Sequence, residues 1–183
     1  MRNAQVAVVV GSLRRESINR KLAVALSALA PDDVPCTLVS IAGLPMYNQD
    51  EENIPNTAVQ AFRDAIAAAD AVLFVTPEFN RSIPGALKNA LDVGSRPYGK
   101  SVWAGRAAGV IGASPGGIGT AVAQQHLRNI LAHLNMRIMG QPEGFIQVRE
   151  GFFDEQGNIA NPDSKAFLQR WMDSYTSFVK TSN

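Results

Sequence analysis

Two hydrophobic periods alternate along this chain, one typical of strands and one typical of helices. Short apolar runs at residues 5–10, 36–41, 71–76 and 107–113 each predict a β-strand. Between the runs, apolar side chains recur every three or four residues, as in the series Ile18, Leu22, Ala25, Leu26 and Leu29, which predicts amphipathic helices. Further helices are expected around residues 59–69, from Pro84 through Leu91, and over 118–134.

The last third of the chain has a less regular pattern. Residues 136–139 and 145–148 predict a fifth strand that is split in two, and 151–161 is a polar turn region. Asn161 is in position to cap a final helix. That helix carries an apolar and aromatic stripe, which we interpret as packing: Phe167, Leu168, Trp171, Tyr175, Phe178 and Val179.

Repeated strand–helix alternation with short links predicts a parallel sheet covered by helices on both faces. The third strand is apolar at nearly every position, as expected of a strand buried on both sides. Five such units fit a single α/β domain over residues 1–183: a flavodoxin-like three-layer sandwich with a five-stranded parallel sheet in the order 2-1-3-4-5. Ligands in such folds bind beyond the carboxyl ends of the strands, where the winding direction switches.

Composition excludes several classes of partner. Seventeen Lys and Arg against sixteen Asp and Glu give a net charge of +1 without a basic block, which argues against nucleic acid. Cys36 is the only cysteine, so it forms no internal disulfide, and we interpret it as a small buried residue of a strand. The chain starts directly with a strand and has no long apolar segment, so we expect a cytoplasmic protein with no membrane association.

The loop after the first strand, residues 11–19, resembles a phosphate cradle. Backbone N–H groups at a helix start are free, the helix dipole is positive there, and Ser12, Arg14, Ser17 and Asn19 add donors. An ordinary strand-to-helix turn capped by Ser17 is an equally good interpretation of this loop alone.

The loops after strands three and four have unusual compositions too. In residues 77–85, Phe79 lies between Glu78 and Asn80 and two prolines restrict the backbone, which suits support of a planar ring; a rigid turn with Asn80 or Ser82 as helix cap is the alternative. In residues 114–119, glycines allow a ligand to approach the backbone closely; a flexible turn is the alternative. Since the fold brings the loops after strands one, three and four together, the three combined favour a ligand site.

Two nucleotide motifs are missing from the sequence. It has no G-x-x-x-x-G-K-[ST] and no G-x-G-x-x-G after the first strand, which argues against nucleoside triphosphate and Rossmann dinucleotide sites. One phosphate cradle with a flat-ring site suits a mononucleotide better.

Taken in order, the three motifs resemble the NADPH-dependent FMN reductase family, which includes quinone, chromate and azo-dye reductases. The similarity extends over about residues 5–148 and rests on the segments Gly11–Arg14 with Ser17 and Asn19, Pro77–Asn80 with Ser82, Pro84, Gly85, 87–90 and Asp92, and Ser114–Gly117. It implies FMN as cofactor, NADPH or NADH as co-substrate, and a homodimer or homotetramer with the flavin near the subunit interface.

The resemblance also implies a role for each matching residue. Ser12, Arg14, Ser17 and Asn19 would hold the FMN phosphate. The isoalloxazine ring would be lined by Pro77, Glu78, Phe79 and Asn80, with Ser82 and Ile83 nearby. Ser114, Gly116 and Gly117 would lie beside the pyrimidine or ribityl side. This chain departs from the family at Phe79, where Tyr is frequent, and at Val93, where Trp often follows Asp92.

The implied function is an FMN-dependent NAD(P)H oxidoreductase acting on quinones or similar acceptors such as chromate, azo compounds or free flavin. Because the flavin performs the redox chemistry, no protein acid or base is named as catalytic, and Glu78 is expected to support the ring or the loop. A flavodoxin-type electron carrier is the alternative, although carriers tend to be strongly acidic. A regulatory protein that retained the fold is a third interpretation.

A few charged and metal-binding residue types remain outside this scheme. His126 and His133 lie seven residues apart, not at the i, i+4 spacing of a metal pair, and are interpreted as surface or interface residues. Arg81, Lys100 and Arg106 are candidates for contact with a nucleotide 2′-phosphate, with solvated surface charge as the favoured alternative.

Overall fold

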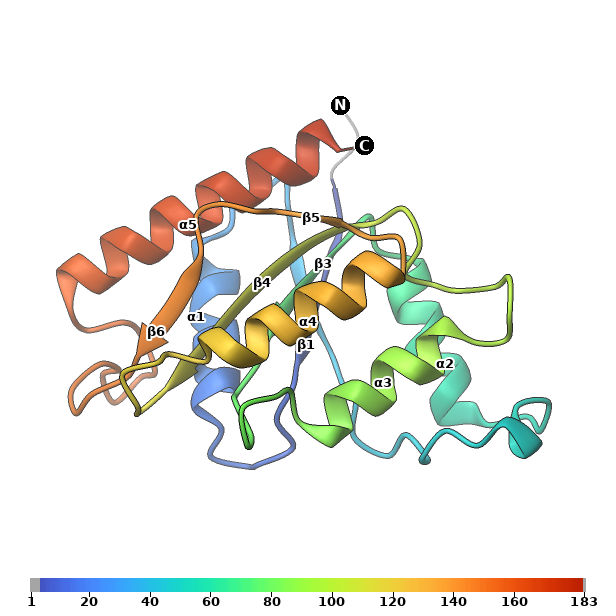
Figure 1. Ribbon diagram of the computed structural model, residues 1–183. Helices are drawn as coiled ribbons and strands as arrows, with labels where there is room; N and C mark the ends of the chain where they lie inside the picture. Colours follow the sequence, from blue (N-terminus) through green and yellow to red (C-terminus); the bar gives the residue numbers. More distant parts are fainter. Residues whose placement is uncertain (1–3, 183) are drawn as a thin grey trace.

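The computed structural model describes residues 4–182 and has one parallel sheet at its centre (Figure 1). The strands are β1 (Val6–Val10), β2 (Cys36–Val39), β3 (Ala71–Val75), β4 (Ala107–Ser114), β5 (Arg137–Ile138) and β6 (Gly144–Gln147). Their order is β2-β1-β3-β4-β5, with β6 also paired to β4, and every pairing is parallel. The predicted order 2-1-3-4-5 is therefore confirmed.

The predicted split of the fifth strand is confirmed as well, and it adds a sixth strand to the sheet. β5 pairs with the first two residues of β4, and β6 pairs with its last four, from Ile111 to Ser114. Both short strands therefore lie along the same side of β4, one after the other, and together they complete the sheet edge.

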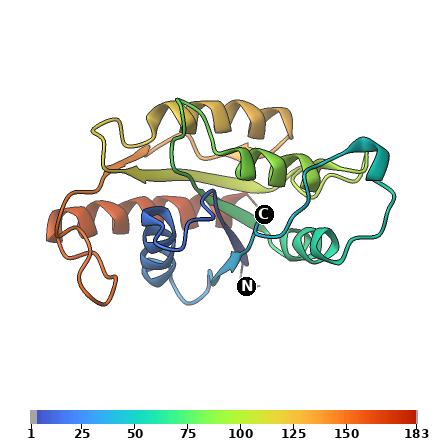
Figure 2. The ribbon, with the colours of Figure 1, turned by 90° about the horizontal axis from the view of Figure 1, so that it is seen from below.

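Helices cover both faces of the sheet, as Figure 2 shows from below. One face is covered by α1 (Ile18–Leu29) and α5 (Pro162–Thr181); the other by α2 (Thr57–Ala67), α3 (Gly85–Ser95) and α4 (Ala121–His133). Successive residues of β1 face opposite layers: Val6 and Val8 pack toward the first pair of helices, whereas Ala7 and Val9 pack toward the other three. Burial on both sides explains why this strand is apolar throughout.

Several element boundaries differ from the sequence-based expectations. β2 ends at Val39, and α3 extends beyond Leu91 to Ser95, with Pro84 as its N-cap. Helix α4 starts at Ala121, three residues later than expected, because Thr120 has φ 70° and cannot belong to a right-handed helix.

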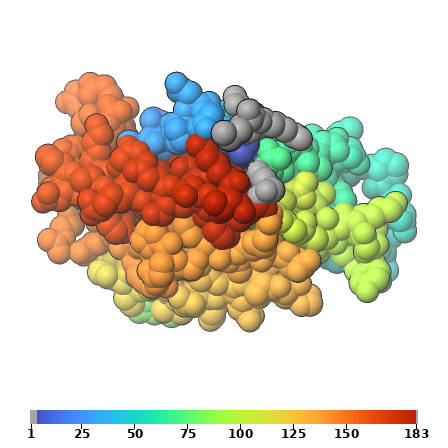
Figure 3. Space-filling view, turned by 90° about the horizontal axis from the view of Figure 1, so that it is seen from above, coloured from blue at the N-terminus to red at the C-terminus, as the bar shows by residue number. Residues whose placement is uncertain are grey.

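The C-terminal helix confirms the packing interpretation of its aromatic stripe. The Asn161 side chain accepts a hydrogen bond from Ser164 N at 2.8 Å and so caps α5 as predicted. Trp171 and Tyr175 are fully buried with their rings stacked at 5.6 Å. Figure 3, which looks down on the molecule from above, shows α5 as a red ridge across that side.

The structure also places the single cysteine and the two histidines. Cys36 is half-buried and packs against the core, and burial raises the pKa of its thiol to about 11. Both histidines are exposed on α4, in agreement with a surface position. Within residues 4–182, the helices do not combine the length and the apolarity that a bilayer crossing demands.

Candidate functional site

The three predicted loops leave the sheet side by side, because hydrogen bonds join them at their bases. Gly11 N donates to Val75 O at 2.9 Å, and Thr76 N donates to Ile111 O at 3.0 Å. The Asn19 side chain is bonded in both directions to the backbone of Ala113, each time at 2.9 Å. The first turn of α1 is therefore fixed to the end of β4, and the loops converge as the topology predicts.

In the first loop, the cap interpretation is confirmed, and it leaves room for the cradle interpretation, which stays a prediction. Ser17 Oγ accepts from Arg20 N at 3.2 Å and caps α1, and Ser12 Oγ accepts from Arg14 N at 3.3 Å. The side chain of Arg14 is exposed, and the first turn of a helix presents N–H groups that have no intrahelical acceptor. Anion-binding capacity thus remains here. The Asn19 side chain is partly committed, since Ala113 uses its carbonyl oxygen and one of its N–H groups, and its contact with a phosphate stays a prediction.

The second loop is a two-residue hairpin. Phe79 N donates to Ser82 O at 2.9 Å and Ser82 N donates to Phe79 O at 3.0 Å. Between them, Asn80 and Arg81 both have positive φ, 50° and 64°, as in a type I′ turn. The alternative of Asn80 or Ser82 as a helix cap is wrong, because Pro84 is the N-cap of α3 and no side chain caps it.

Glu78 joins this hairpin to the start of α4. Its Oε2 accepts from Val122 N and Ala123 N, both at 3.1 Å, and its Oε1 accepts from Arg81 Nη1 at 2.9 Å. Burial raises the pKa of Glu78, but the hydrogen bonds from Ala123, Arg81 and Val122 outweigh burial, and the net pKa is lowered. The carboxylate therefore stays ionised and holds the loop, in line with its predicted structural role.

The third loop contains two glycines that the packing of the protein does not require. A Cβ on Gly116 would meet only Ser114 Oγ, at 3.5 Å, and one on Gly117 only Gln147 Nε2, at 3.9 Å. Gly112, which lies inside β4, contrasts with both: a Cβ there would clash with Thr76 O and Thr120 Oγ1. Gly116 and Gly117 therefore leave open space beside the backbone.

That space belongs to a cleft of about 650 Å³ between the second and third loops. The cleft is lined by Glu78, Asn80, Arg81, Ser114, Gly116, Gly117, Ile118 and Thr120. Five of the eight were predicted as site residues from the sequence. Ile118 and Thr120 were missed as site residues. Thr120 was assigned to the helix expected over 118–134, and Ile118 was placed where that helix begins and the loop 114–119 ends.

The remaining predicted residues lie around the cleft, not on its lining. Ser12, Arg14, Ser17 and Asn19 belong to the neighbouring first loop. Pro77 lies next to Gly11, and Ile83 is 8% exposed and packs into the core. Ser82 Oγ lies 3.1 Å from His126 Nδ1.

Each of the three loops also exposes one large apolar side chain. Leu13, Phe79 and Ile118 are 59%, 56% and 43% exposed. Apolar side chains beside a few fixed polar groups are typical of pockets for flat organic ligands. Leu13 and Ile118 were not predicted as site residues from the sequence, although both belong to loops that were.

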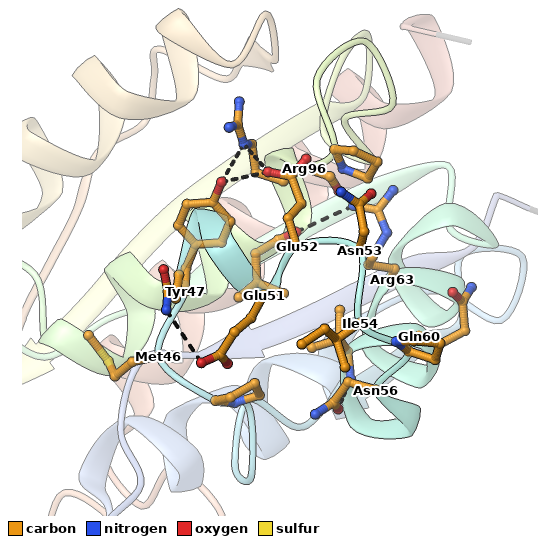
Figure 4. A pocket seen from close by; sticks show the side chains of 16 residues that line it. Met46, Tyr47, Glu51, Glu52, Asn53, Ile54, Asn56, Gln60, Arg63 and Arg96 are labelled. Carbon is orange, nitrogen blue, oxygen red and sulfur yellow. Dashed lines mark hydrogen bonds and ion pairs between the residues drawn. The ribbon is translucent and has the colours of Figure 1, made fainter.

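A second pocket, of about 240 Å³, lies between the β2–α2 loop and the end of α3 (Figure 4). Tyr47 OH donates to Glu52 Oε2 at 2.7 Å, and Arg96 Nε donates to Tyr47 OH at 2.7 Å. The hydrogen bond to Glu52 raises the pKa of Tyr47. Asn89 fixes the loop by accepting from Tyr47 N and donating to Pro45 O, both at 2.8 Å. The polar groups of this pocket are thus largely paired with one another.

Comparison with known proteins gives consistent similarities over the whole described fold. The NADPH-dependent FMN reductase family profile matches residues 4–149. A 2-hydroxy-1,4-benzoquinone reductase from Burkholderia sp is 51% identical over 176 residues, 96% of each chain. A quinone reductase from Escherichia coli K12 is 37% identical over 96% of this chain and 95% of its own length. The structure of the flavoenzyme NAD(P)H:(acceptor) oxidoreductase FerB from Paracoccus denitrificans superposes with a TM-score of 0.94, at 41% identity over 98% of both chains.

Proposed function

This chain belongs to the NADPH-dependent FMN reductase family and is an NAD(P)H-dependent oxidoreductase, and from this premise we propose that quinones are the acceptors of its electrons. The names of the relatives support this acceptor class, since they include a 2-hydroxy-1,4-benzoquinone reductase and a quinone reductase. The observation that carries the proposal is the cleft itself, with its two unfilled glycine positions and its apolar rim.

The residues of the three loops fit FMN. The start of α1 with Ser12, Arg14 and Ser17 suits the single phosphate, because N–H groups, hydroxyls and a guanidinium all stabilise an anion. Asn19 contributes mainly by anchoring that helix start to Ala113.

The ring has a suitable place beside the cleft. Pro77, Glu78, Phe79 and Asn80 form the hairpin side; Ser82 closes the turn by its backbone bonds to Phe79, and Ile83 packs into the core. On the other side, Ser114, Gly116 and Gly117 leave room for a flat ring at the backbone. When bound, FMN supplies the redox chemistry between the nicotinamide and the acceptor.

The protein's own part in catalysis is to position the reactants. Glu78 holds the hairpin against α4, so that one wall of the cleft is fixed to the helix that follows the other wall. Phe79, Leu13 and Ile118 provide apolar surface that excludes water from a planar substrate. Phe79 lacks the hydroxyl of tyrosine, so its contribution is limited to ring packing.

The visible spectrum of the purified protein tests this function. We expect added FMN to stay with the protein through desalting and to bleach anaerobically on addition of NADPH or NADH, and quinone to restore the colour. Retained FMN that neither nucleotide bleaches would favour an electron carrier instead. Absence of FMN binding would overturn the proposal.

We also propose that the enzyme is a single-domain, cytoplasmic homo-oligomer. A homodimer or homotetramer is supported by the exposure of Met46, Ile54 and Tyr98 at the end of the molecule with the second pocket. Light scattering at several concentrations tests it. A single half-buried cysteine supports a cytoplasmic location, and the two apolar layers on one sheet support a single domain over the chain.

A further inference from the structure

Three cationic residues were candidates for anion contact, and the structure separates them. Arg106 is committed to backbone carbonyls, with Nε donating to Ala69 O at 2.9 Å and Nη2 to Ala67 O at 2.8 Å. Lys100 lies in the α3–β4 connection, where its carbonyl accepts from Arg63 beside the second pocket. Arg81 is the one of the three that lines the cleft.

We propose, building on the function above, that Arg81 recognises an anionic oxygen of the second substrate that enters the cleft. The anion is either an ionised oxygen on the quinone acceptor or a phosphate of the pyridine nucleotide. Both present the same chemistry to a guanidinium, which has five N–H donors in a rigid planar arrangement.

The backbone conformation of Arg81 is unusual for an arginine. Arg81 has φ 64° at the second central position of the turn, where glycine is favoured and an arginine is strained. A strained residue persists where the surrounding structure or a function requires its side chain. The turn directs this side chain to the cleft, where it is 66% exposed.

Glu78 does not depend on Arg81 alone for its hydrogen bonds. Arg81 Nη1 donates to Glu78, yet that carboxylate is already held by two backbone N–H groups of α4. An ion pair with one exposed partner adds little stability. The pair therefore does not explain the strained arginine, and it leaves most of the guanidinium N–H groups in the described structure available to a ligand.

The charge of the cleft lining also favours an anionic ligand. The lining of the cleft contains two charged residues, Glu78 and Arg81, and the negative one is turned toward the start of α4. The accessible charge of the cleft is thus positive, and it stands beside the apolar side chains that suit a ring. An aromatic anion satisfies both features at once.

The test uses the FMN-loaded protein and three variants. Arg81→Asn removes the charge while keeping a residue that tolerates positive φ, and Arg81→Lys keeps the charge. Lys88→Gln is the matched control, because it removes an exposed cation of α3 that pairs with Asp92 away from the cleft lining.

Two pairs of probes separate the sources of the anion. Anaerobic titration without reductant compares 2-hydroxy-1,4-naphthoquinone, an anion at neutral pH, with neutral 1,4-naphthoquinone. Steady-state kcat/KM compares NADPH, which has a 2′-phosphate, with NADH. For Arg81→Asn we expect about a tenfold loss for one charged probe relative to its partner, the size typical of a lost hydrogen bond to a charged group. Arg81→Lys should retain most of the affinity, and Lys88→Gln should match the wild type.

Each result decides between the alternatives. Selective loss for the hydroxyquinone assigns Arg81 to the acceptor, and selective loss for NADPH assigns it to the nucleotide phosphate. Equal changes for charged and neutral probes, or a parallel loss of FMN affinity, would overturn the inference, since Arg81 would then act only on the hairpin. If the wild type is not reduced by either nucleotide, the proposed function fails, whereas the quinone titration still reports on Arg81.

Discussion

The cleft and the second pocket differ in how their polar groups are used. The cleft is lined by loops that follow β3 and β4, whereas the second pocket is lined by the β2–α2 loop, α2 and the end of α3. Beside α3, Tyr47, Glu52 and Arg96 bond to one another, and Arg63 donates to the carbonyls of Val93, Gly94, Arg96 and Lys100. In the cleft, by contrast, two glycines face open space and Arg81 is mostly exposed.

This difference indicates which of the two pockets is suited to bind a ligand. Polar groups that saturate one another stabilise a loop and offer little to a ligand, because binding would have to break bonds that already exist. Open space beside a backbone and hydrogen-bond donors without partners do not stabilise the protein itself, but they can accommodate a ligand. We therefore propose that the larger cleft is the functional site, and that the bonds around the smaller pocket mainly hold the β2–α2 loop on α3.

The largest effect should come from filling the cleft. Gly116→Val places a branched side chain where the structure has only Ser114 Oγ as a neighbour, so the fold should tolerate it. FMN affinity should fall by at least about a hundredfold, because the added methyl groups would occupy the space for the ring. Stability should change by no more than about 0.5 kcal/mol. Fluorescence titration with FMN and urea denaturation measure the two quantities.

Gly112 contrasts with Gly116, because the protein itself fills the space beside its Cα. Gly112→Ala should impair folding itself, since its Cβ would clash with the Thr76 carbonyl oxygen and with Thr120. Full FMN occupancy in Gly116→Val, or a normally stable Gly112→Ala, would remove the distinction between the two kinds of glycine.

The second pocket should respond in the opposite way. Arg63→Ala leaves carbonyls at the end of α3 without their donor, and we expect a loss of about 2 kcal/mol in the free energy of unfolding with unchanged FMN affinity. Lys100→Ala is the control. It removes a cation from the α3–β4 connection but keeps the backbone carbonyl of residue 100, which accepts from Arg63. A clear loss of FMN affinity in Arg63→Ala would show that the second pocket takes part in the site.

The fold and the loops around the cleft could be predicted from the sequence, because both depend on local patterns. Apolar runs and helical spacing predicted the sheet order, which is confirmed. Gly, Pro and Ser in three loops led to the hypothesis of a ligand site where these loops converge. Asn161 was correctly predicted as a cap, since the capping bond is local.

Long-range bonds could not be predicted in the same way. Asn19 resembled a phosphate ligand, but its side chain is bonded to Ala113, 94 residues away. The start of α4 was misplaced because nothing in a single sequence shows that Thr120 takes a left-handed conformation. The self-paired network of Tyr47, Glu52 and Arg96 likewise connects segments whose proximity only the fold reveals.

A smaller effect is expected at the phosphate end of the site. Arg14→Ala should weaken FMN binding by about tenfold through loss of one charge-assisted hydrogen bond, while riboflavin, which has no phosphate, should bind equally well to both proteins. Arg15→Ala is a suitable control, because it removes an adjacent exposed charge that was not assigned to the site. Equal losses for FMN and riboflavin would contradict a phosphate contact at Arg14.

The smallest effect concerns Glu78, which connects the hairpin to α4. Its pKa is lowered in the folded protein, so its ionised form adds stability at pH values above the ordinary glutamate value of about 4.3, and this contribution disappears as the pH falls through the lower, folded pKa. Glu78→Gln keeps the shape but loses the charge at the helix start, and should cost about 1 kcal/mol at pH 7. The difference between the two proteins should begin to shrink below about pH 4, where the carboxylate of the unfolded wild-type chain takes up a proton, and should disappear below the lower, folded pKa. A difference that stays constant from pH 7 to pH 3 would show that the carboxylate charge does not hold the hairpin on α4.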